Sequence, residues 1–279
     1  MNLTDHNRQN KIAVINDISG FGRCSIAVSL PIISQMKIQC CPVPTSVFSN
    51  HTGFKNFFFD DYTDKMLEYT DNWKQLGLKF NGILTGFLGS ARQIEIVSDI
   101  ICSFRSENTI VIIDPVMGDN GKPYPTYTED MCHRMRELIK HADIITPNLT
   151  EACILTDTPY TPESFTNKDY YKILNKLKEC GADKIVITGI QKSASLSNIV
   201  YVKGSEPVIL TQRRIGHERS GTGDVFASVI AADAVHNVDF IKSVKKASSF
   251  VKKCIEVTER FDTPPTDGVC FEEILHILK

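Results

Sequence analysis

One short stretch of the chain joins a carboxylate to two glycines directly before an apolar run. It is Ser220-Gly221-Thr222-Gly223-Asp224, and residues 225–234 have the spacing of a buried helical face with small residues in between. The first backbone N–H groups of a helix lack intrahelical partners and carry the positive end of the helix dipole. Gly221, Thr222 and Gly223 are therefore predicted to form an anion cradle. Asp224 stands at its edge, where a carboxylate could take a proton from a hydroxyl while the N–H groups hold a phosphate.

Capping offers a second interpretation of Asp224. The helix dipole alone stabilises an Asp in the first turn of a helix by about 0.3–1 kcal/mol, and short glycine turns are common. These five residues by themselves favour catalysis and capping equally.

Two more carboxylates follow a continuously apolar run at residues 109–113, which is typical of a parallel strand covered on both faces. They are Asp114 and Asp119, and a loop rich in Gly, Pro and Tyr continues to residue 127. This arrangement suits an Mg²⁺-nucleotide site beneath a mobile flap. The alternative is a pair of turn-forming Asp residues. Further along, Asn148 and Glu151 have the spacing of a helix cap and its third residue, so capping explains them without any catalysis.

Two polar turns near the amino terminus could contact a small ligand. Residues 11–16 are predicted to form a strand and residues 17–22 a glycine-bearing turn, in which Asp17 and Ser19 are plausible ligand contacts, although Ser19 could equally cap the next helix. Gly20-x-Gly22 lacks the third glycine of a dinucleotide fingerprint, so that interpretation is rejected. A second turn, residues 48–53, is polar and bracketed by aromatics, and it could hold a flat ring. His51 within it is more often a structural group than a catalyst.

The elements that must position these residues repeat as strand, turn and helix. Short apolar runs at 38–46, 82–86, 143–146 and 184–188 alternate with helical patterns, among them 60–78, 238–256 and 268–278, and residues 198–202 and 207–211 look like a β extension. We therefore expect an α/β fold with a mainly parallel central sheet and helices on both faces. Residues 1–10 are expected to be a flexible start, and residues 11–279 a single domain.

Composition excludes several classes of protein. The 279 residues are 42% hydrophobic and 23% charged with a net charge of −2, which is ordinary for a globular protein and gives no nucleic-acid footprint. Residues 1–10 are polar, and no apolar run approaches the length of a membrane span, so neither a secretory signal nor a membrane partner is expected. Nine cysteines without a Cys-x-x-Cys pair suit reduced thiols in a cytoplasm.

Several stretches together resemble the pyridoxal kinase family within the ribokinase-like superfamily. They are residues 48–53 (FSNHTG), 84–90 (LTGFLGS), 114–119 (DPVMGD), 142–148 with Glu151, and 221–224 (GTGD), and they span most of the chain. The last motif marks only the broad superfamily, whereas SNHTG and DPVMGD are far more specific.

The resemblance implies ATP-dependent phosphorylation of the 5′-hydroxymethyl group of a B6 vitamer. It implies that Asp224 is the base and that Gly221, Thr222 and Gly223 form the anion hole. The ring would be held by Asp17 or Ser19, Phe48, Ser49, Asn50, His51, Thr52 and Phe87. Phe87 stands where many relatives have tyrosine, which removes any hydroxyl contact there. The nucleotide would be held by Asp114, Asp119, Asn148, Glu151 and Thr188, with Asp114, Asp119 and Glu151 serving the metal.

The same resemblance implies Mg²⁺ with ATP, a cytoplasmic location and a homodimer, and it leaves open a monovalent cation such as K⁺. Neither a G-x-x-x-x-G-K-[ST] loop nor an H-R-D loop occurs, so the nucleotide must be held in another way. Two alternatives remain. One is a kinase for the hydroxymethylpyrimidine of thiamine synthesis, and the other is a non-catalytic B6-vitamer carrier on the same scaffold.

Overall fold

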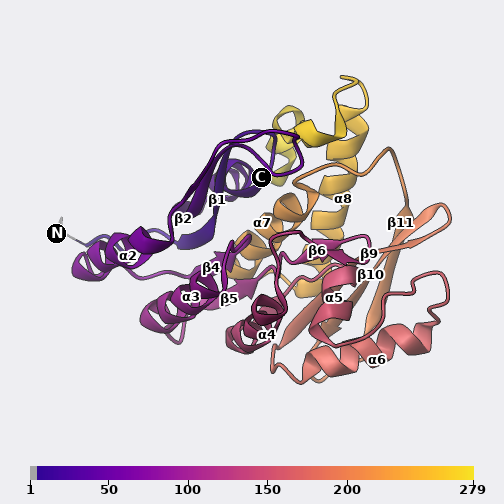
Figure 1. The fold of residues 1–279 in the computed structure, drawn as a ribbon, viewed down its shortest axis with the longest axis horizontal. Helices are drawn as coiled ribbons and strands as arrows, with labels where there is room; N and C mark the ends of the chain where they lie inside the picture. The colour runs from indigo at the N-terminus through magenta and orange to yellow at the C-terminus, as the bar shows by residue number, and fades with distance from the viewer. Residues whose placement is uncertain (1–4) are drawn as a thin grey trace.

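The computed structural model describes residues 5–279, and a sheet of nine strands runs through its centre (Figure 1). The strand order across the sheet is β11-β10-β9-β8-β5-β4-β1-β2-β3. The six strands from β9 to β2 are parallel, and β3, β10 and β11 are antiparallel to their neighbours. The strands are β1 Lys11–Phe21, β2 Gln39–Asn50, β3 Phe59–Asp61, β4 Gly82–Thr85, β5 Ile110–Ile113, β8 Ile144–Ile145, β9 Lys184–Lys192, β10 Ser195–Val202 and β11 Val208–Arg213.

Helices cover both faces of this sheet, as the sequence predicts. One face carries α2 to α6, and the other carries α1, α7, α8 and the C-terminal 3-10 helix. The helices are α1 Ser25–Gln35, α2 Met66–Gln75, α3 Ala91–Phe104, α4 Glu129–Leu138, α5 Leu149–Leu155, α6 Asn167–Lys178, α7 Thr222–Val235 and α8 Phe240–Thr258, with 3-10 helices at Thr63–Lys65, Ile139–His141, Pro265–Asp267 and Phe271–Leu278. A small antiparallel hairpin, β6 Gly118–Asp119 and β7 Lys122–Pro123, stands apart from the main sheet.

Strand β5, at the centre of the sheet, is apolar throughout because each of its side chains meets one of two cores. In β5, Val111 and Ile113 belong to the core beneath α2 to α6, whereas Ile112 belongs to the core beneath α1, α7 and α8. Successive side chains of a strand point to opposite faces, so a strand covered on both sides needs apolar residues at every position. The prediction that residues 109–113 form a parallel strand covered on both faces is confirmed.

Helix α7 is buried nearly all round. Every residue from Val225 to Val235 is buried, and the alanines among them allow close packing against α1 and α8. The predicted buried helix after Asp224 is therefore confirmed, and its amino end cannot be displaced without disturbing both neighbours.

Three local expectations are wrong. Residues 17–22 continue β1 to Phe21 instead of forming a turn, because they pair with the extended end of β2 from Val47 to Asn50. The helix expected over 60–78 begins only at Met66, because Phe59–Asp61 pairs with β2 as an edge strand. The helix expected over 268–278 is a 3-10 helix over Phe271–Leu278.

Part of the expected flexible start is held in place. Residues 1–4 lie outside the described residues, but Asn7 donates from Nδ2 to the carbonyl of Gly77 (3.0 Å) and accepts at Oδ1 from the N–H of Lys79 (2.8 Å). The division into residues 1–10 and one domain stays a prediction. No helix within residues 5–279 is both long and apolar enough to cross a membrane.

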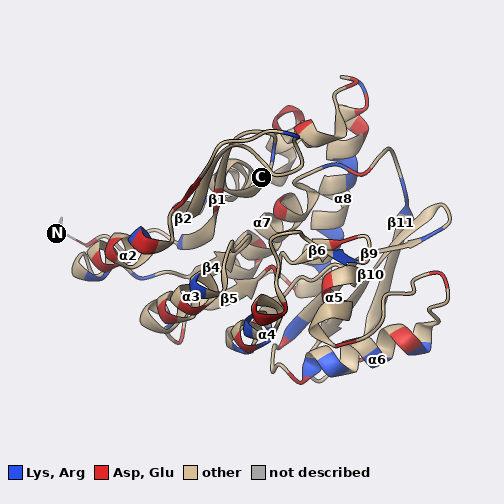
Figure 2. Ribbon diagram, in the orientation of Figure 1, with Lys and Arg blue, Asp and Glu red and all other residues tan. Residues whose placement is uncertain are grey.

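Charges of both signs are interspersed along the helices of one face (Figure 2). Lys74 pairs with Asp71 in α2, Arg134 with Asp130 in α4, and Lys172 with Asp169 in α6. Such exposed pairs contribute little to stability. The charges that decide function lie elsewhere.

Candidate active site

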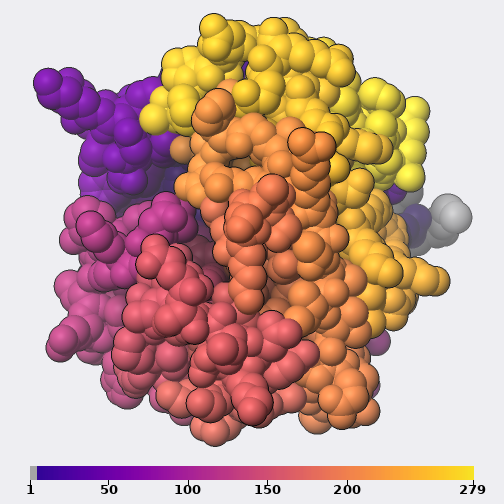
Figure 3. Space-filling model, turned by 90° about the vertical axis from the view of Figure 1, so that its right-hand side faces the viewer, coloured from indigo at the N-terminus to yellow at the C-terminus, as the bar shows by residue number. Residues whose placement is uncertain are grey.

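A cavity of about 1230 Å³ lies at the carboxyl ends of the central parallel strands. Ligands of open α/β sheets bind at this edge. The surface is hollowed between the purple-to-magenta and the orange parts of the chain, which come from its first half and its last third (Figure 3). The walls of the cavity include all the predicted catalytic and nucleotide residues: Asp114, Asp119, Asn148, Glu151, Thr188, Gly221, Thr222, Gly223 and Asp224.

The anion cradle forms where α7 begins. Gly221 is the helix cap with a left-handed φ of 75°, and a Cβ at this position would lie 1.8 Å from the carbonyl oxygen of Arg23. Only glycine permits both that backbone conformation and that close approach. The N–H groups of the first turn therefore face the cavity without side chains from Gly221 or Gly223 in front of them.

Asp224 is a half-buried carboxylate held by a single side-chain amide. Asn16 donates from Nδ2 to Asp224 Oδ1 at 3.1 Å. Burial raises the pKa of Asp224 to about 6, while the backbone N–H of Ser25 and the amide of Asn16 lower it and the nearby charge of Asp17 raises it. A pKa just below neutrality suits a general base, which must be ionised yet able to hold a proton.

Asp114 faces the cradle from the end of β5. Its Oδ1 accepts from the hydroxyl of Thr146 at 2.8 Å, and a Cβ on Gly223 would lie 4.0 Å from its Oδ2. Burial and the charge of Asp224 raise the pKa of Asp114 to about 8. At neutral pH this carboxyl holds a proton unless a cation takes the proton's place.

Asn148 and Glu151 form the predicted capping box at the start of α5. Glu151 N–H donates to Asn148 Oδ1 at 2.9 Å, and Asn148 N–H donates to Glu151 Oε2 at 2.7 Å, which confirms the capping interpretation. The same side chains reach further, since Glu151 Oε1 accepts from the N–H of Met117 and Asn148 Nδ2 donates to the carbonyl of Gly118. Burial and the charge of Asp114 raise the pKa of Glu151 well above its usual range. The box thus also anchors the start of the β6–β7 hairpin.

Asp119 lies on that hairpin, close enough to Glu151 for its charge to raise the pKa of Glu151. The hairpin is tied to α5 by the N–H of Gly121, which donates to Thr150 Oγ1 at 2.9 Å, and it reaches Glu218 through the amide of Asn120 at 3.5 Å. Burial raises the pKa of Asp119. A flap over the cavity, as predicted from the sequence, fits this placement.

The three carboxylates predicted to serve a metal do not form a metal site by themselves. Within residues 5–279, no three His, Cys, Asp or Glu side chains converge closely enough to hold an ion. Mg²⁺ commonly keeps several waters and is bound through one or two carboxylates plus substrate phosphates. Asp114 and Glu151 fit that donor set because no ion pair among the described residues neutralises either of them.

Thr188, predicted to contact the nucleotide, lies in the wall of the cavity. It lies on β9, bridges to Asn148 in parallel fashion, and donates its N–H to the carbonyl of Pro147 at 2.9 Å. Its backbone is therefore fixed against the start of α5, and its side chain is among those lining the cavity.

The residues predicted to hold the ring are divided by the structure. Phe87 lines the cavity, and its ring centroid lies 6.3 Å from that of Phe48, which is buried against Phe57 and Phe59. Of the described residues, Asp17, Ser19 and residues 48–52 do not line the cavity. Phe87 is thus the one predicted ring residue, among the described residues, that lines the same cavity as the predicted nucleotide residues.

Most of those remaining ring-side groups are bonded within the protein. Asp17 is 5% exposed and accepts from the hydroxyls of Ser25 (2.5 Å) and Ser19 (2.9 Å). Ser49 accepts from the N–H of Phe58. Asn50 donates to the carbonyl of Asn56 at 2.8 Å. These bonds shape the loop that follows β2, and Thr52 lies exposed within it.

Both ring nitrogens of His51 have partners. Nε2 lies 2.7 Å from the carbonyl oxygen of Thr266, and Nδ1 accepts from the N–H of Gly53 at 3.1 Å. Since a carbonyl only accepts, the proton belongs on Nε2. His51 is therefore a structural link between the loop after β2 and the segment after α8.

The sequence prediction missed several polar residues of the cavity, among them Asn16, Ser25 and Thr146. Thr146 directly follows β8, where a polar residue was a usable signal, whereas Asn16 lies within β1 and has no such signal. Ser25 has a left-handed φ of 56° that only the structure can reveal. Such a conformation costs about 1–3 kcal/mol in a residue other than glycine and is concentrated at functional sites.

A family model described as phosphomethylpyrimidine kinase matches residues 30–266. The chain belongs to this family. Among solved structures, one described as "a putative phosphomethylpyrimidine kinase" from Bacteroides thetaiotaomicron superposes with a TM-score of 0.95 at 38% identity, over 98% of this chain and 95% of that one. A second crystal form of that kinase, with pyridoxal, gives a TM-score of 0.93 at 37% identity, over 97% and 96% of the two chains.

Pyridoxal kinases are also among the relatives of this chain. A "putative pyridoxal kinase" of Caenorhabditis elegans is 30% identical over 77% of this chain and 71% of its own. The pyridoxal kinase of Lactobacillus plantarum superposes with a TM-score of 0.89 at 26% identity, over 96% of each chain. The chain spans slightly less than two thirds of some mammalian relatives, such as 64% of the sheep pyridoxal kinase. The resemblance to pyridoxal kinases and the ribokinase-like fold are confirmed.

Proposed function

We propose that this chain is an ATP-dependent kinase that phosphorylates the 5′-hydroxymethyl group of a B6 vitamer. The observation that carries the proposal is Asp224, a half-buried carboxylate with a pKa of about 6 at the amino end of α7, in the same cavity as Asp114. Pyridoxal in the structure of the 37% identical relative supports the choice of ring.

The reaction follows from the placement of these groups. Asp224 accepts the proton of the vitamer hydroxyl as the oxygen attacks the terminal phosphorus of ATP, and ADP leaves with the electrons of the broken P–O bond. The N–H groups of Gly221, Thr222 and Gly223 stabilise the charge on the transferred phosphoryl oxygens. Mg²⁺, when bound with ATP, supplies further neutralisation of phosphate charge. Asp114 and Glu151 would hold it, with Asp119 near them on the hairpin.

The remaining roles complete the proposal. Asn148 and Thr188 position the nucleotide, and Phe48 and Phe87 hold the ring, together with Asp17, Ser19 and residues 49–52. A change in the loop after β2 would have to bring residues 49–52 to the ligand, since their bonds now lie within that loop or, for His51, reach Thr266. We also propose a cytoplasmic homodimer, supported by the exposed aromatic rings of Phe57, Phe58 and Phe59 at the edge of the sheet. A monovalent cation such as K⁺ is a further candidate cofactor.

A second candidate substrate is hydroxymethylpyrimidine. The matching family model carries the phosphomethylpyrimidine name, and both substrates are small nitrogen rings with a hydroxymethyl group. A non-catalytic carrier is disfavoured because the chain retains a base, an anion cradle and uncompensated carboxylates together.

The test offers pyridoxal, pyridoxine, pyridoxamine and hydroxymethylpyrimidine side by side to the purified chain with Mg-ATP. ADP release and the mass of each phosphate ester are measured. Phosphorylation of the vitamers, lost in Asp224→Asn, is the expected result. Turnover on the pyrimidine alone would assign the chain to the second candidate. Ring binding without any ester would support the carrier.

A further inference from the structure

One buried amide joins three segments of the site. Asn16 lies on β1 and is 3% exposed, yet it lines the cavity. Its partners come from β1 itself, from the segment after β4 and from the start of α7. The segment after β4 carries Phe87, and the start of α7 carries Asp224. Asn16 is therefore the point at which the proposed ring side and the proposed base meet.

The orientation of this amide is fixed by its neighbours. Asn16 Oδ1 accepts from the backbone N–H of Asp17 and from that of Phe87, both at 2.9 Å. A backbone N–H can only donate, so the oxygen must lie on this side and the NH₂ group must face Asp224. The geometry of the network thus decides the O and N assignment.

Packing also prevents the amide from turning away. A Cβ on Gly86 would lie 2.3 Å from Asn16 Nδ2 and 2.5 Å from its Cγ. The amide therefore packs against the backbone of Gly86 and is hydrogen-bonded by two N–H donors, so it cannot rotate freely. Its remaining freedom is small, and so is that of the hydrogen bond it donates to Asp224.

We propose that Asn16 is a positioning residue for Asp224, and that its fixed NH₂ group holds the carboxylate in the orientation from which it takes the substrate proton. This rests on the proposed function, in which Asp224 is the base. A fixed donor leaves the carboxylate one preferred rotamer, and reactions of oriented groups lose about 100-fold for a misplacement of about 1 Å.

The test uses a substitution that keeps every other contact of Asn16. Asn16→Asp is nearly isosteric and still accepts from the N–H groups of Asp17 and Phe87. Assayed at a pH high enough to ionise both carboxyls, it cannot donate to Asp224. We expect kcat to fall about 10–100-fold, with KM for ATP and for the vitamer within about twofold of the original values because no substrate contact is removed.

A matched control is Asn81, which lies directly before β4 and contacts the first residue of β1. Asn81 Oδ1 accepts from the N–H of Lys11 at 3.0 Å, and Asn81 does not line the cavity. Asn81→Asp therefore makes the same chemical change beside β1 and should leave kcat unchanged. If Asn81→Asp lowers kcat as much as Asn16→Asp does, the effect is general to the strand and the proposal is wrong.

A second variant moves the amide without changing its charge. Gly86→Ala places a methyl group against Asn16 and should lower kcat in the same direction, again without a change in KM. A kcat within about twofold of the original for both Asn16→Asp and Gly86→Ala would overturn the proposal.

Crystal structures of the original chain and of Asn16→Asp supply a readout that needs no activity. We expect one Asp224 rotamer in the first and a rotated or divided carboxylate in the second. An unmoved carboxylate would overturn the proposal. If the original chain phosphorylates none of the offered rings, the proposed function fails, while the Asp224 rotamer still decides whether Asn16 positions it.

Discussion

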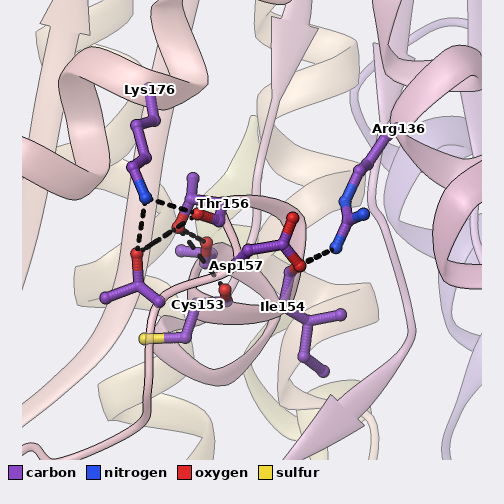
Figure 4. A network of polar contacts seen from close by, with 8 residues as sticks. Arg136, Cys153, Ile154, Thr156, Asp157 and Lys176 are labelled. Carbon is purple, nitrogen blue, oxygen red and sulfur yellow. Dashed lines mark hydrogen bonds and ion pairs between the residues drawn. The ribbon is translucent and has the colours of Figure 1, made fainter. Parts of the chain in front are cut away.

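The two ends of helix α5 differ in whether their charged groups have partners of opposite charge. At its carboxyl end, Arg136 donates to the carbonyl of Ile154 at 2.7 Å and pairs with Asp157, and Lys176 donates to the carbonyl of Thr156 at 2.7 Å (Figure 4). Cations at this end satisfy the last carbonyls and complement the helix dipole. The charges there are balanced within the chain.

The amino end of α5 has an excess of acid. Glu151 is buried beside Asp114, and Asp114 in turn interacts with Asp224. The pKa of each of these carboxyls is raised by burial. Among the described residues, no Lys or Arg forms an ion pair with them. One end of the helix has its charges paired within the chain, whereas the other keeps its carboxyls without a cationic partner among the described residues.

The largest expected effect comes from removing the base at the acidic end. Asp224→Asn should lower kcat by at least about 10²–10⁴ while the free energy of unfolding changes by at most about 1 kcal/mol. ADP release and urea unfolding measure the two quantities. A variant with near-normal turnover would show that Asp224 only caps α7.

The pH profile of the original chain provides a second test of Asp224. The rate should fall as pH drops through about 6, because protonation removes the base. The measurement is kcat/KM against pH at saturating Mg²⁺. A profile that stays flat through this range would show that the rate does not depend on ionisation of the Asp224 carboxyl.

Asp114→Asn should weaken Mg²⁺ binding and raise the free energy of unfolding. The folded-state pKa of about 8 lies above the unfolded value, so the original chain loses stability as pH rises between about 4 and 8. The variant lacks that loss, and its urea midpoint at pH 8 should exceed that of the original. The Mg²⁺ concentration for half-maximal rate should rise about tenfold. An unchanged Mg²⁺ requirement would remove Asp114 from the proposed site.

Proton release should accompany binding of the magnesium nucleotide. At neutral pH the Asp114 carboxyl holds a proton, which a cation should displace. Calorimetry of Mg-ADP binding in two buffers of different ionisation enthalpy counts the protons. The original chain should release more than Asp114→Asn, and equal release would argue against a cation beside Asp114.

The smallest effects are expected at the balanced end. Arg136→Met should lower the free energy of unfolding by about 1–3 kcal/mol, because a charge-assisted bond to a carbonyl is lost. Lys176→Met should cost less, about 0.3–1 kcal/mol. Both should leave kcat and KM within twofold, as urea unfolding and steady-state rates would show. A loss of activity in either would mean that the two ends of α5 are coupled.

The sequence predicted what local pattern controls. The alternation of Val111, Ile112 and Ile113 between two cores follows from an unbroken apolar run, and the Asn148–Glu151 box follows from a three-residue spacing. The parallel sheet and the buried helix after Asp224 were also predicted from such local patterns. These features depend on neighbours close in the chain.

What the sequence did not reveal depends on partners far along the chain. Asn16 meets Phe87 and Asp224 across 71 and 208 residues, so no local pattern marks it. Residues 17–21 look like a turn because of their glycines, but pairing with β2 overrides that preference. Phe59–Asp61 lies in a helical pattern and is drawn into the sheet by the same strand.

The close approach at Gly221 also determines when the site can exist during folding. Arg23 lies between two glycines, since a Cβ at Gly268 would meet its Cβ at 2.7 Å and a Cβ at Gly221 would meet its carbonyl. Its N–H also donates to the carbonyl of Asp267 at 3.1 Å. The cradle thus takes shape only when segments almost 250 residues apart have docked on one another. Such distant contacts form late and slowly, so a partly folded or C-terminally shortened chain would present no phosphate site, and catalytic competence would report completion of the whole fold.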